Sequence, residues 1–218
     1  FVDRLLAGVE VRADRVAAFR PGPHMAEEAE ARLSDIDWCT VTLNELDVTL
    51  EMQPASAWGK DVREARLKVA QRLTETIRGA PGVVEAALPM TRMPLAGRMT
   101  RKVPKLDIDP ASDRIATAEV QLRMLGAVRS AAAVFGCESD RKRQADSLIE
   151  MLSDYADEAF DLIHAEDVED VDRALKVLET VARFLTHLDA QEAARTVRRR
   201  AAVTIHGTDV RRASPEAA

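Results

Sequence analysis

The amino-acid sequence predicts an all-α protein, an antiparallel helical bundle of about six to seven helices in two packed halves. Aromatic residues make up only 4% of the 218 residues, and with 9 Gly and 9 Pro the chain has little of the material from which sandwiches and barrels are built. Apolar residues recur instead at spacings of three and four, the period of an amphipathic helix. A composition of 46% hydrophobic and 31% charged residues is that of a globular protein.

Residues 1–90 are predicted to form an N-terminal subdomain of three helices. The Pro-Gly-Pro triplet at 21–23 ends the first helix near residue 20. The next segment, 25–52, fits two patterns: a strand-like alternation at Val41, Leu43, Val48 and Leu50, and a helical repeat at Ile36, Cys39, Leu43, Leu46 and Leu50. The helical repeat covers more residues, so we expect a helix, while a hairpin over 36–52 stays open.

A third helix is predicted from the apolar stripe over 62–77. Gly79 and Pro81 are typical of a helix end, because glycine adopts the left-handed conformation and proline cannot donate the next backbone hydrogen bond. Residues 83–88 allow one or two further turns before Pro89.

The helical pattern is lost over 91–110, where proline and glycine recur. All five basic residues of this segment precede its first acidic residue, Asp107. A stretch of this length without regular structure is uncommon inside a compact domain. We therefore expect a basic linker or long functional loop that separates the two halves.

Residues 111–203 are predicted to form a C-terminal up-and-down bundle of four helices, followed by a flexible tail over 204–218. Ser112 precedes the first helix, and Gly136 ends it. The expected starts of the later helices are Ser139 or Asp140, Asp167, and a capping-box-like pair, Asp189 and Glu192. The last helix is expected to end near Val203.

Ten carboxylates lie within 150–172, a segment without Lys or Arg. Such a face repels itself, so it indicates either a solvated helix surface or a docking face for a cation or a basic partner. That basic partner includes the chain's own 91–105 segment and its Arg195–Arg200 cluster. The candidate binding residues of this acidic face are Glu150, Asp154, Asp157, Glu158 and Asp161.

Basic residues gather in the 91–105 segment and near the end of the last predicted helix. Such groups contact nucleic-acid phosphates, although the second cluster also suits the negative carboxyl end of a helix. Scarce aromatic residues argue against base stacking. The candidate basic binding residues are Arg92, Arg98, Arg101, Lys102, Lys105, Arg195, Arg198 and Arg199.

Motifs for catalysis and metal binding are weak. Asp161 and His164 are three residues apart, so on one helix both could bind the same metal ion, with Glu158 as a third ligand. The full set of carboxylates and histidines of a di-iron bundle is missing from the sequence. The sequence contains no nucleophile-elbow, phosphate-loop or dinucleotide fingerprint. We therefore name no catalytic residue, metal ligand or cofactor, and the sequence leans away from an enzyme.

Composition also bears on location. The net charge of −6 argues against wholesale binding to nucleic acid or to an anionic membrane. No apolar run approaches the ~18 residues of a membrane span. Two cysteines and an N-terminus unlike a secretory signal favour the cytoplasm, and an excess of arginine over lysine favours a bacterial source.

Taken together, these features predict a non-enzymatic helical interaction or regulatory module that binds a protein partner or itself, and no membrane. The alternative is a nucleic-acid-associated regulator that uses 91–105 and Arg195–Arg200. A second alternative is a helical-bundle enzyme or a carboxylate and histidine metal protein.

Overall fold

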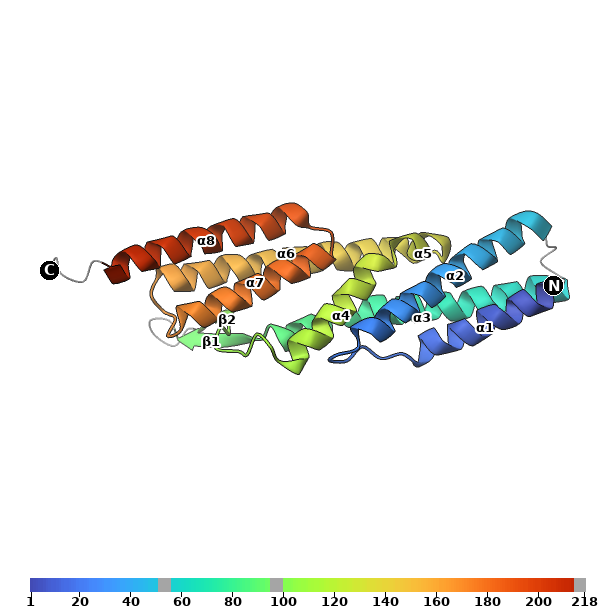
Figure 1. Ribbon diagram of the computed structural model, residues 1–218, viewed down its shortest axis with the longest axis horizontal. Helices are drawn as coiled ribbons and strands as arrows, with labels where there is room; N and C mark the ends of the chain where they lie inside the picture. The colour runs from blue at the N-terminus through green and yellow to red at the C-terminus, as the bar shows by residue number, and fades with distance from the viewer. Residues whose placement is uncertain (51–55, 95–99, 214–218) are drawn as a thin grey trace.

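The computed structural model describes residues 1–50, 56–94 and 100–213, and over these residues the protein is mostly helical (Figure 1). The elements in chain order are α1 (Val2–Ala18), α2 (Ala26–Leu50), α3 (Ala57–Ala87), β1 (Met90–Pro94), β2 (Thr100–Pro104), α4 (Asp113–Ala127), α5 (Arg129–Val134), α6 (Glu138–His164), α7 (Val171–His187) and α8 (Gln191–Ala213). Helices α1–α3 and α6–α8 lie toward opposite ends of an elongated molecule, with α4 and α5 between them. The predicted helical class is confirmed in its main feature.

Helix α2 shows which of the two patterns over 25–52 governs the fold. Ile36, Cys39 and Leu43 are buried at helical spacing, whereas Val41 and Val48, which gave the strand-like alternation, are 62% and 72% exposed. The hairpin alternative is therefore wrong over 36–50, because burial follows the helical repeat. Residues 51 and 52 lie outside the described residues.

Helix α3 begins where Ser56 Oγ accepts a hydrogen bond of 3.0 Å from the Gly59 backbone N–H. The predicted end at Gly79 and Pro81 is wrong, since the helix continues through Pro81 to Ala87. The physical reason is packing: the buried stripe of the helix does not stop at the proline. It consists of Val69, Leu73, Ile77, Ala80, Val84 and Ala87.

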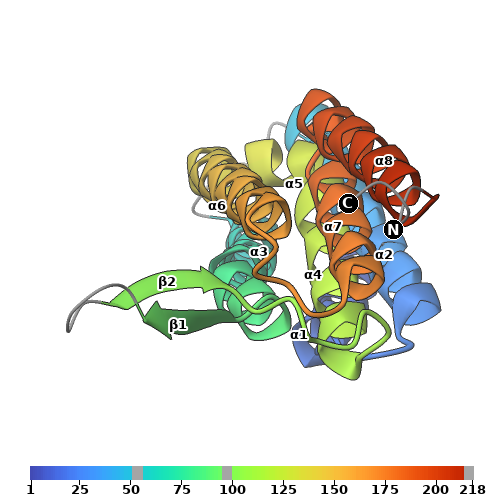
Figure 2. The same ribbon diagram turned by 90° about the vertical axis from the view of Figure 1, so that its left-hand side faces the viewer.

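The basic segment that was predicted as a linker or loop contains an antiparallel hairpin, β1–β2. Met90 pairs with Pro104 and Arg92 with Lys102, so these four residues share one face of the hairpin. Lys105 N–H donates to Pro89 O (3.0 Å) and closes the base. Figure 2 shows the hairpin projecting from the helices beside α3 and α6.

The first helix of the C-terminal half is shorter than predicted. It ends at Ala127, and a separate short helix, α5, carries the chain to Gly136. Val128, at the break, has φ −78° and ψ 18°, outside the helical region. Gly136, the predicted stop of a single long helix, follows the end of α5 with φ +72°, where glycine has no steric cost.

Two predicted helix starts are also corrected. Asp170, rather than Asp167, caps α7, and its Oδ1 accepts a 2.9 Å hydrogen bond from the Arg173 backbone N–H. Asp189 lies in the left-handed region (φ 65°), and its Oδ2 accepts a 3.1 Å hydrogen bond from Arg129 rather than closing a capping box. Helix α8 then runs ten residues past the predicted end at Val203, to Ala213, and residues 214–218 lie outside the described part of the chain.

The largest cluster of buried apolar side chains runs from Val2 to Val197 and draws on both predicted halves. The division into 1–90, 91–110 and 111–203 therefore stays a prediction. Helix α3 packs against α1, α4 and α6, and Gln121 Nε2 on α4 donates to Thr76 O on α3 at 2.6 Å. Helix α4 crosses the end of α7 closely, because a Cβ added at Gly126 would lie 2.0 Å from the His187 backbone oxygen.

Both tryptophans lie near α1. The Arg12 guanidinium on α1 stacks over Trp38 at 3.9 Å from the ring centroid. Trp58, at the start of α3, is 44% exposed, and its Nε1 donates to Asp3 Oδ1 at 2.8 Å. These contacts join α1 to α2 and α3.

Candidate functional site

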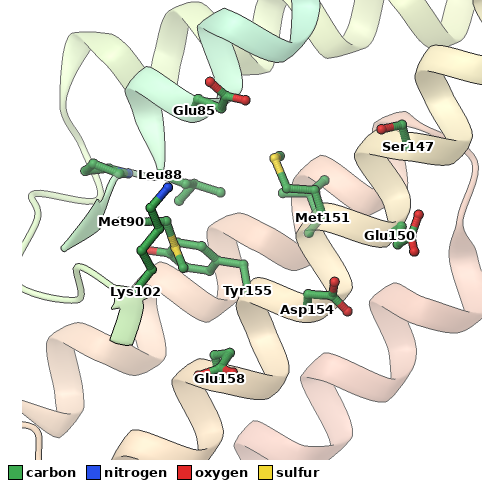
Figure 3. Close-up of a pocket in the computed structure, with 12 residues that line it drawn as sticks. Glu85, Leu88, Met90, Lys102, Ser147, Glu150, Met151, Asp154, Tyr155 and Glu158 are labelled. Atoms are coloured by element: carbon green, nitrogen blue, oxygen red, sulfur yellow. The ribbon is translucent and has the colours of Figure 1, made fainter. Parts of the chain in front are cut away.

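A groove of about 660 Å³ lies between the carboxyl end of α3, the base of the hairpin and the middle of α6 (Figure 3). Its volume falls within the range of roughly 300–1,000 Å³ that is typical of binding sites. Helix α3 reaches the groove only because it continues past Pro81. The lining residues are Glu85, Leu88, Pro89, Met90, Lys102, Ser147, Glu150, Met151, Leu152, Asp154, Tyr155 and Glu158.

The groove has an apolar surface that is only partly covered by the protein. Leu88, Leu152 and Tyr155 are buried, Met151 is half-buried, and Met90 is 46% exposed. In Figure 3, Tyr155 extends from α6 toward the hairpin, and Met151 lies on the same helix one turn earlier. Methionine side chains adapt to varied partners because they are unbranched and polarisable.

Tyr155 holds the hairpin to α6. Its hydroxyl donates to Lys105 O at 3.3 Å. Burial, reinforced by the negative charge of Asp107, raises the pKa of Tyr155 above its ordinary value, so the phenol stays protonated near neutral pH. Tyr155 therefore contributes a neutral aromatic wall rather than a base.

The rim of the groove is acidic. Glu85 comes from α3, and Glu150, Asp154 and Glu158 come from α6, against one cation among the described lining residues, Lys102. Glu158 accepts a hydrogen bond from Arg101 on β2. Within the part of the chain that the structure describes, Glu85, Glu150 and Asp154 make no ion pair, so their charges face solvent uncompensated.

The predicted acidic face is therefore divided. Glu150, Asp154 and Glu158 line the groove, whereas Asp157 pairs with Arg200 from α8. Asp161 lies beyond the groove on an exposed part of α6. Of the acids after α6, Asp170 serves as a helix cap.

Four of the eight predicted basic residues form ion pairs with the chain's own acids. Arg101 pairs with Glu158, and Lys105 lies 4.0 Å from Asp107. On α8, the guanidinium groups pair with acids of α6, α7 or α8 itself: Arg195 with Glu192 at 2.7 Å, Arg198 with Glu179 at 3.0 Å and Arg200 with Asp157. The hairpin and α8 thus present no single basic surface over the described residues.

The remaining basic candidates are scattered. Arg92 and Lys102 face each other across the hairpin, where like charges repel. Arg199 lines a separate small cavity with His164 at the α6–α8 contact. Arg98 lies outside the described residues.

Neither a metal-binding cluster nor a membrane-spanning helix is found among the described residues. His164 Nδ1 lies 2.6 Å from Phe160 O, and no group of three His, Cys, Asp or Glu side chains in the described ranges is placed to hold a metal ion. Over the same ranges, none of the helices has the length and apolar character needed to cross a membrane.

A second acidic groove, of about 410 Å³, lies between α1 and α3. It also has four carboxylates and one lysine, but its apolar lining consists only of Leu6, Ala7 and Ala65. Lys68 there pairs with Asp14. Acidic charge is thus common to both grooves, while an aromatic ring and methionines are found only at the α3–α6 groove among the described lining residues.

Sequence reasoning found the acids of α6 but missed Glu85, Met90, Met151 and Tyr155. The continued apolar stripe after Pro81 was the available signal for Glu85, since it predicts that α3 extends. Met90 and Lys102 reach the groove only through the hairpin register, which a basic, proline-flanked segment does not reveal.

Comparisons of the chain with protein-family models, with curated proteins and with solved structures found no match.

Proposed function

We propose that the chain is an antiparallel helical bundle that acts as a non-enzymatic interaction module and binds a basic segment of a protein partner in the α3–α6 groove. The observation that carries the proposal is the combination, in one concave site, of a half-exposed apolar surface and three acids that form no ion pair with any described residue. The acids are Glu85, Glu150 and Asp154, and Met90 is the most exposed apolar residue of the site. A cytoplasmic location in a bacterium belongs to the same proposal.

Electrostatics and the hydrophobic effect favour the same kind of ligand. Carboxylates grouped on one side of a cleft raise the local concentration of cationic groups and steer their approach. Covering Met90 and Met151 would remove apolar surface from water, worth about 25 cal/mol per Å². A basic, partly apolar protein segment satisfies both, whereas a simple inorganic cation satisfies only the first.

The nucleic-acid alternative has less support. Among the described candidates, Arg101, Arg195 and Arg198 are engaged by the chain's own carboxylates. A polyanion approaching Arg92 and Lys102 on the hairpin would also meet the acidic rim of α6, on a chain whose net charge is −6. A protein partner with positive charge meets no such repulsion.

The proposal is tested by affinity capture from a lysate of the source organism, with the wild-type protein and the double variant Glu150→Gln/Asp154→Asn side by side. The matched control is Glu10→Gln/Glu64→Gln, which removes the same charge from the groove between α1 and α3. We expect a discrete protein that the wild type and the control retain, that the groove variant loses, and that high salt weakens.

All four substituted acids are exposed and all four substitutions relieve like-charge repulsion, so circular dichroism should show folded protein in each case. Capture of the same proteins by the groove variant, or recovery of nuclease-sensitive material alone, would remove the proposal.

A further inference from the structure

Helix α6 presents two parallel rows of side chains to the groove. Glu150, Asp154 and Glu158 follow one another at steps of four residues, and Ser147, Met151 and Tyr155 form a second row at the same steps. With a rise of about 1.5 Å per residue, the acidic row extends over roughly 12 Å. A polar row thus runs beside a mainly apolar one along the length of the site.

The opposite wall is formed by the end of α3 and by side chains from one face of the hairpin. Leu88 and Glu85 come from the end of α3, and the hairpin contributes Met90 and Lys102 from one face. An extended peptide lying on this face would have no ladder to pair with, and its backbone N–H and C=O groups would be left without partners against apolar side chains. A helix satisfies its own backbone groups and presents side chains in rows of the same period.

We propose that the occupant of the groove is an amphipathic α-helix of a partner protein, laid along α6, with cations four residues apart beside an apolar row. This inference rests on the proposed function and specifies its partner. The partner's cations face Glu150, Asp154 and Glu158, and its apolar row covers Met90 and Met151 beside the buried Tyr155 ring.

Lys102 has a special place in this arrangement. It extends from β2 into the groove as the one cation among the described lining residues (Figure 3). Its neighbour Arg101 already pairs with Glu158. The hairpin therefore places positive charge at the site where the partner's cations bind, and Lys102 repels those cations. Removing Lys102 should strengthen binding, while removing the acids should weaken it.

The test uses synthetic peptides and fluorescence anisotropy with the full chain. The probe is a labelled helix of about five turns with Lys at three positions four residues apart and Leu in the adjacent row. One control peptide has the same composition in scrambled order, and a second carries two central prolines that prevent a helix. Spermidine serves as a small cation without a helix.

We expect the wild-type protein to bind the probe at least about tenfold more tightly than either control peptide. Glu150→Gln/Asp154→Asn should weaken binding by about tenfold, since two exposed ion pairs are lost, and Lys102→Gln should tighten it by about threefold. The controls Glu10→Gln/Glu64→Gln, in the groove between α1 and α3, and Lys60→Gln, in the first turn of α3, should leave it unchanged.

Equal affinity for the proline-containing peptide, full displacement of the probe by spermidine at comparable concentration, or weaker binding by Lys102→Gln would each overturn the helix inference. These outcomes are separable from failure of the proposed function. If the groove variant still loses its partner in the lysate capture, the interaction module stands and only the helical form of its ligand is wrong.

Discussion

Replacing Gly126 with alanine tests how closely α4 packs on the end of α7. The added Cβ would lie 2.0 Å from the His187 backbone oxygen and 3.3 Å from its carbonyl carbon, and Cβ contacts under 3.0 Å are essentially never seen. The two backbones must therefore separate by about 1 Å, because neither contact atom belongs to a side chain that can rotate away. Overpacking of this kind costs about 1–3 kcal/mol.

Helix propensity acts in the opposite direction, since alanine is better than glycine inside a helix by up to about 1 kcal/mol. The clash involves backbone on both sides, so we expect a net loss of about 2 kcal/mol in the free energy of unfolding. For a chain of this length, that loss lowers the midpoint of thermal unfolding by roughly 4–8 °C. Urea and thermal denaturation followed by circular dichroism measure both quantities.

Gly79→Ala and Gly82→Ala are matched controls, because an added Cβ at either position has no neighbour within 4 Å. Both glycines lie inside α3, and we expect each alanine to stabilise the protein by about 0.5–1 kcal/mol. The same substitution should thus have opposite signs in α4 and α3. A Gly126→Ala protein as stable as the wild type would refute the close α4–α7 packing.

Three further predictions concern local energetics. Pro81→Ala should raise the free energy of unfolding by about 2 kcal/mol in urea titrations, because an interior proline costs a helix about 3 kcal/mol. The hydrogen bond from His187, assisted by nearby arginines, lowers the pKa of Glu119 below its ordinary value of 4.5. The ionised carboxylate therefore stabilises the folded protein above pH 4.5, and this stabilisation is lost as the pH falls through the lowered pKa. Glu119→Gln should therefore be less stable than the wild type at neutral pH by roughly 1 kcal/mol, and the difference should shrink below pH 4.5. Burial raises the pKa of Cys39 to about 11 and also raises that of Cys137, so a disulfide reagent at about pH 8 should label neither thiol until the protein is denatured.

Helical periodicity predicted those parts of the fold in which burial alone decides the conformation. The repeat through Ile36, Leu43 and Leu46 outweighed the strand-like alternation that includes Val41 and Val48, because a helix of that register buries Ile36, Leu43 and Leu46. Local rules failed where packing outweighed them. Pro81 is tolerated inside α3 because Ile77, Ala80 and Val84 continue the buried stripe on either side of it.

Of the acids at the candidate site, the sequence predicted only those that lie on a single helix, α6. The spacing of Glu150, Asp154 and Glu158 places them on one side of α6, which is a local property. Whether each charge is free depends on contacts between distant segments: Arg101 and Glu158 are 57 residues apart, and Arg200 and Asp157 are 43 apart. Such pairings depend on the tertiary arrangement and leave no periodic signal in the sequence.

The placement of the chromophores gives the protein two separate optical reporters. Trp38 and Trp58, the only tryptophans of the chain, both lie where α2 and α3 meet α1, whereas the single tyrosine, Tyr155, lies in the groove on α6. Indole emission therefore follows the environment of one end of the molecule, and ultraviolet difference absorption of the phenol follows the other. Ligand entering the groove should perturb the phenol signal and leave the indole emission unchanged, so the unlabelled wild-type protein already reports where a ligand binds.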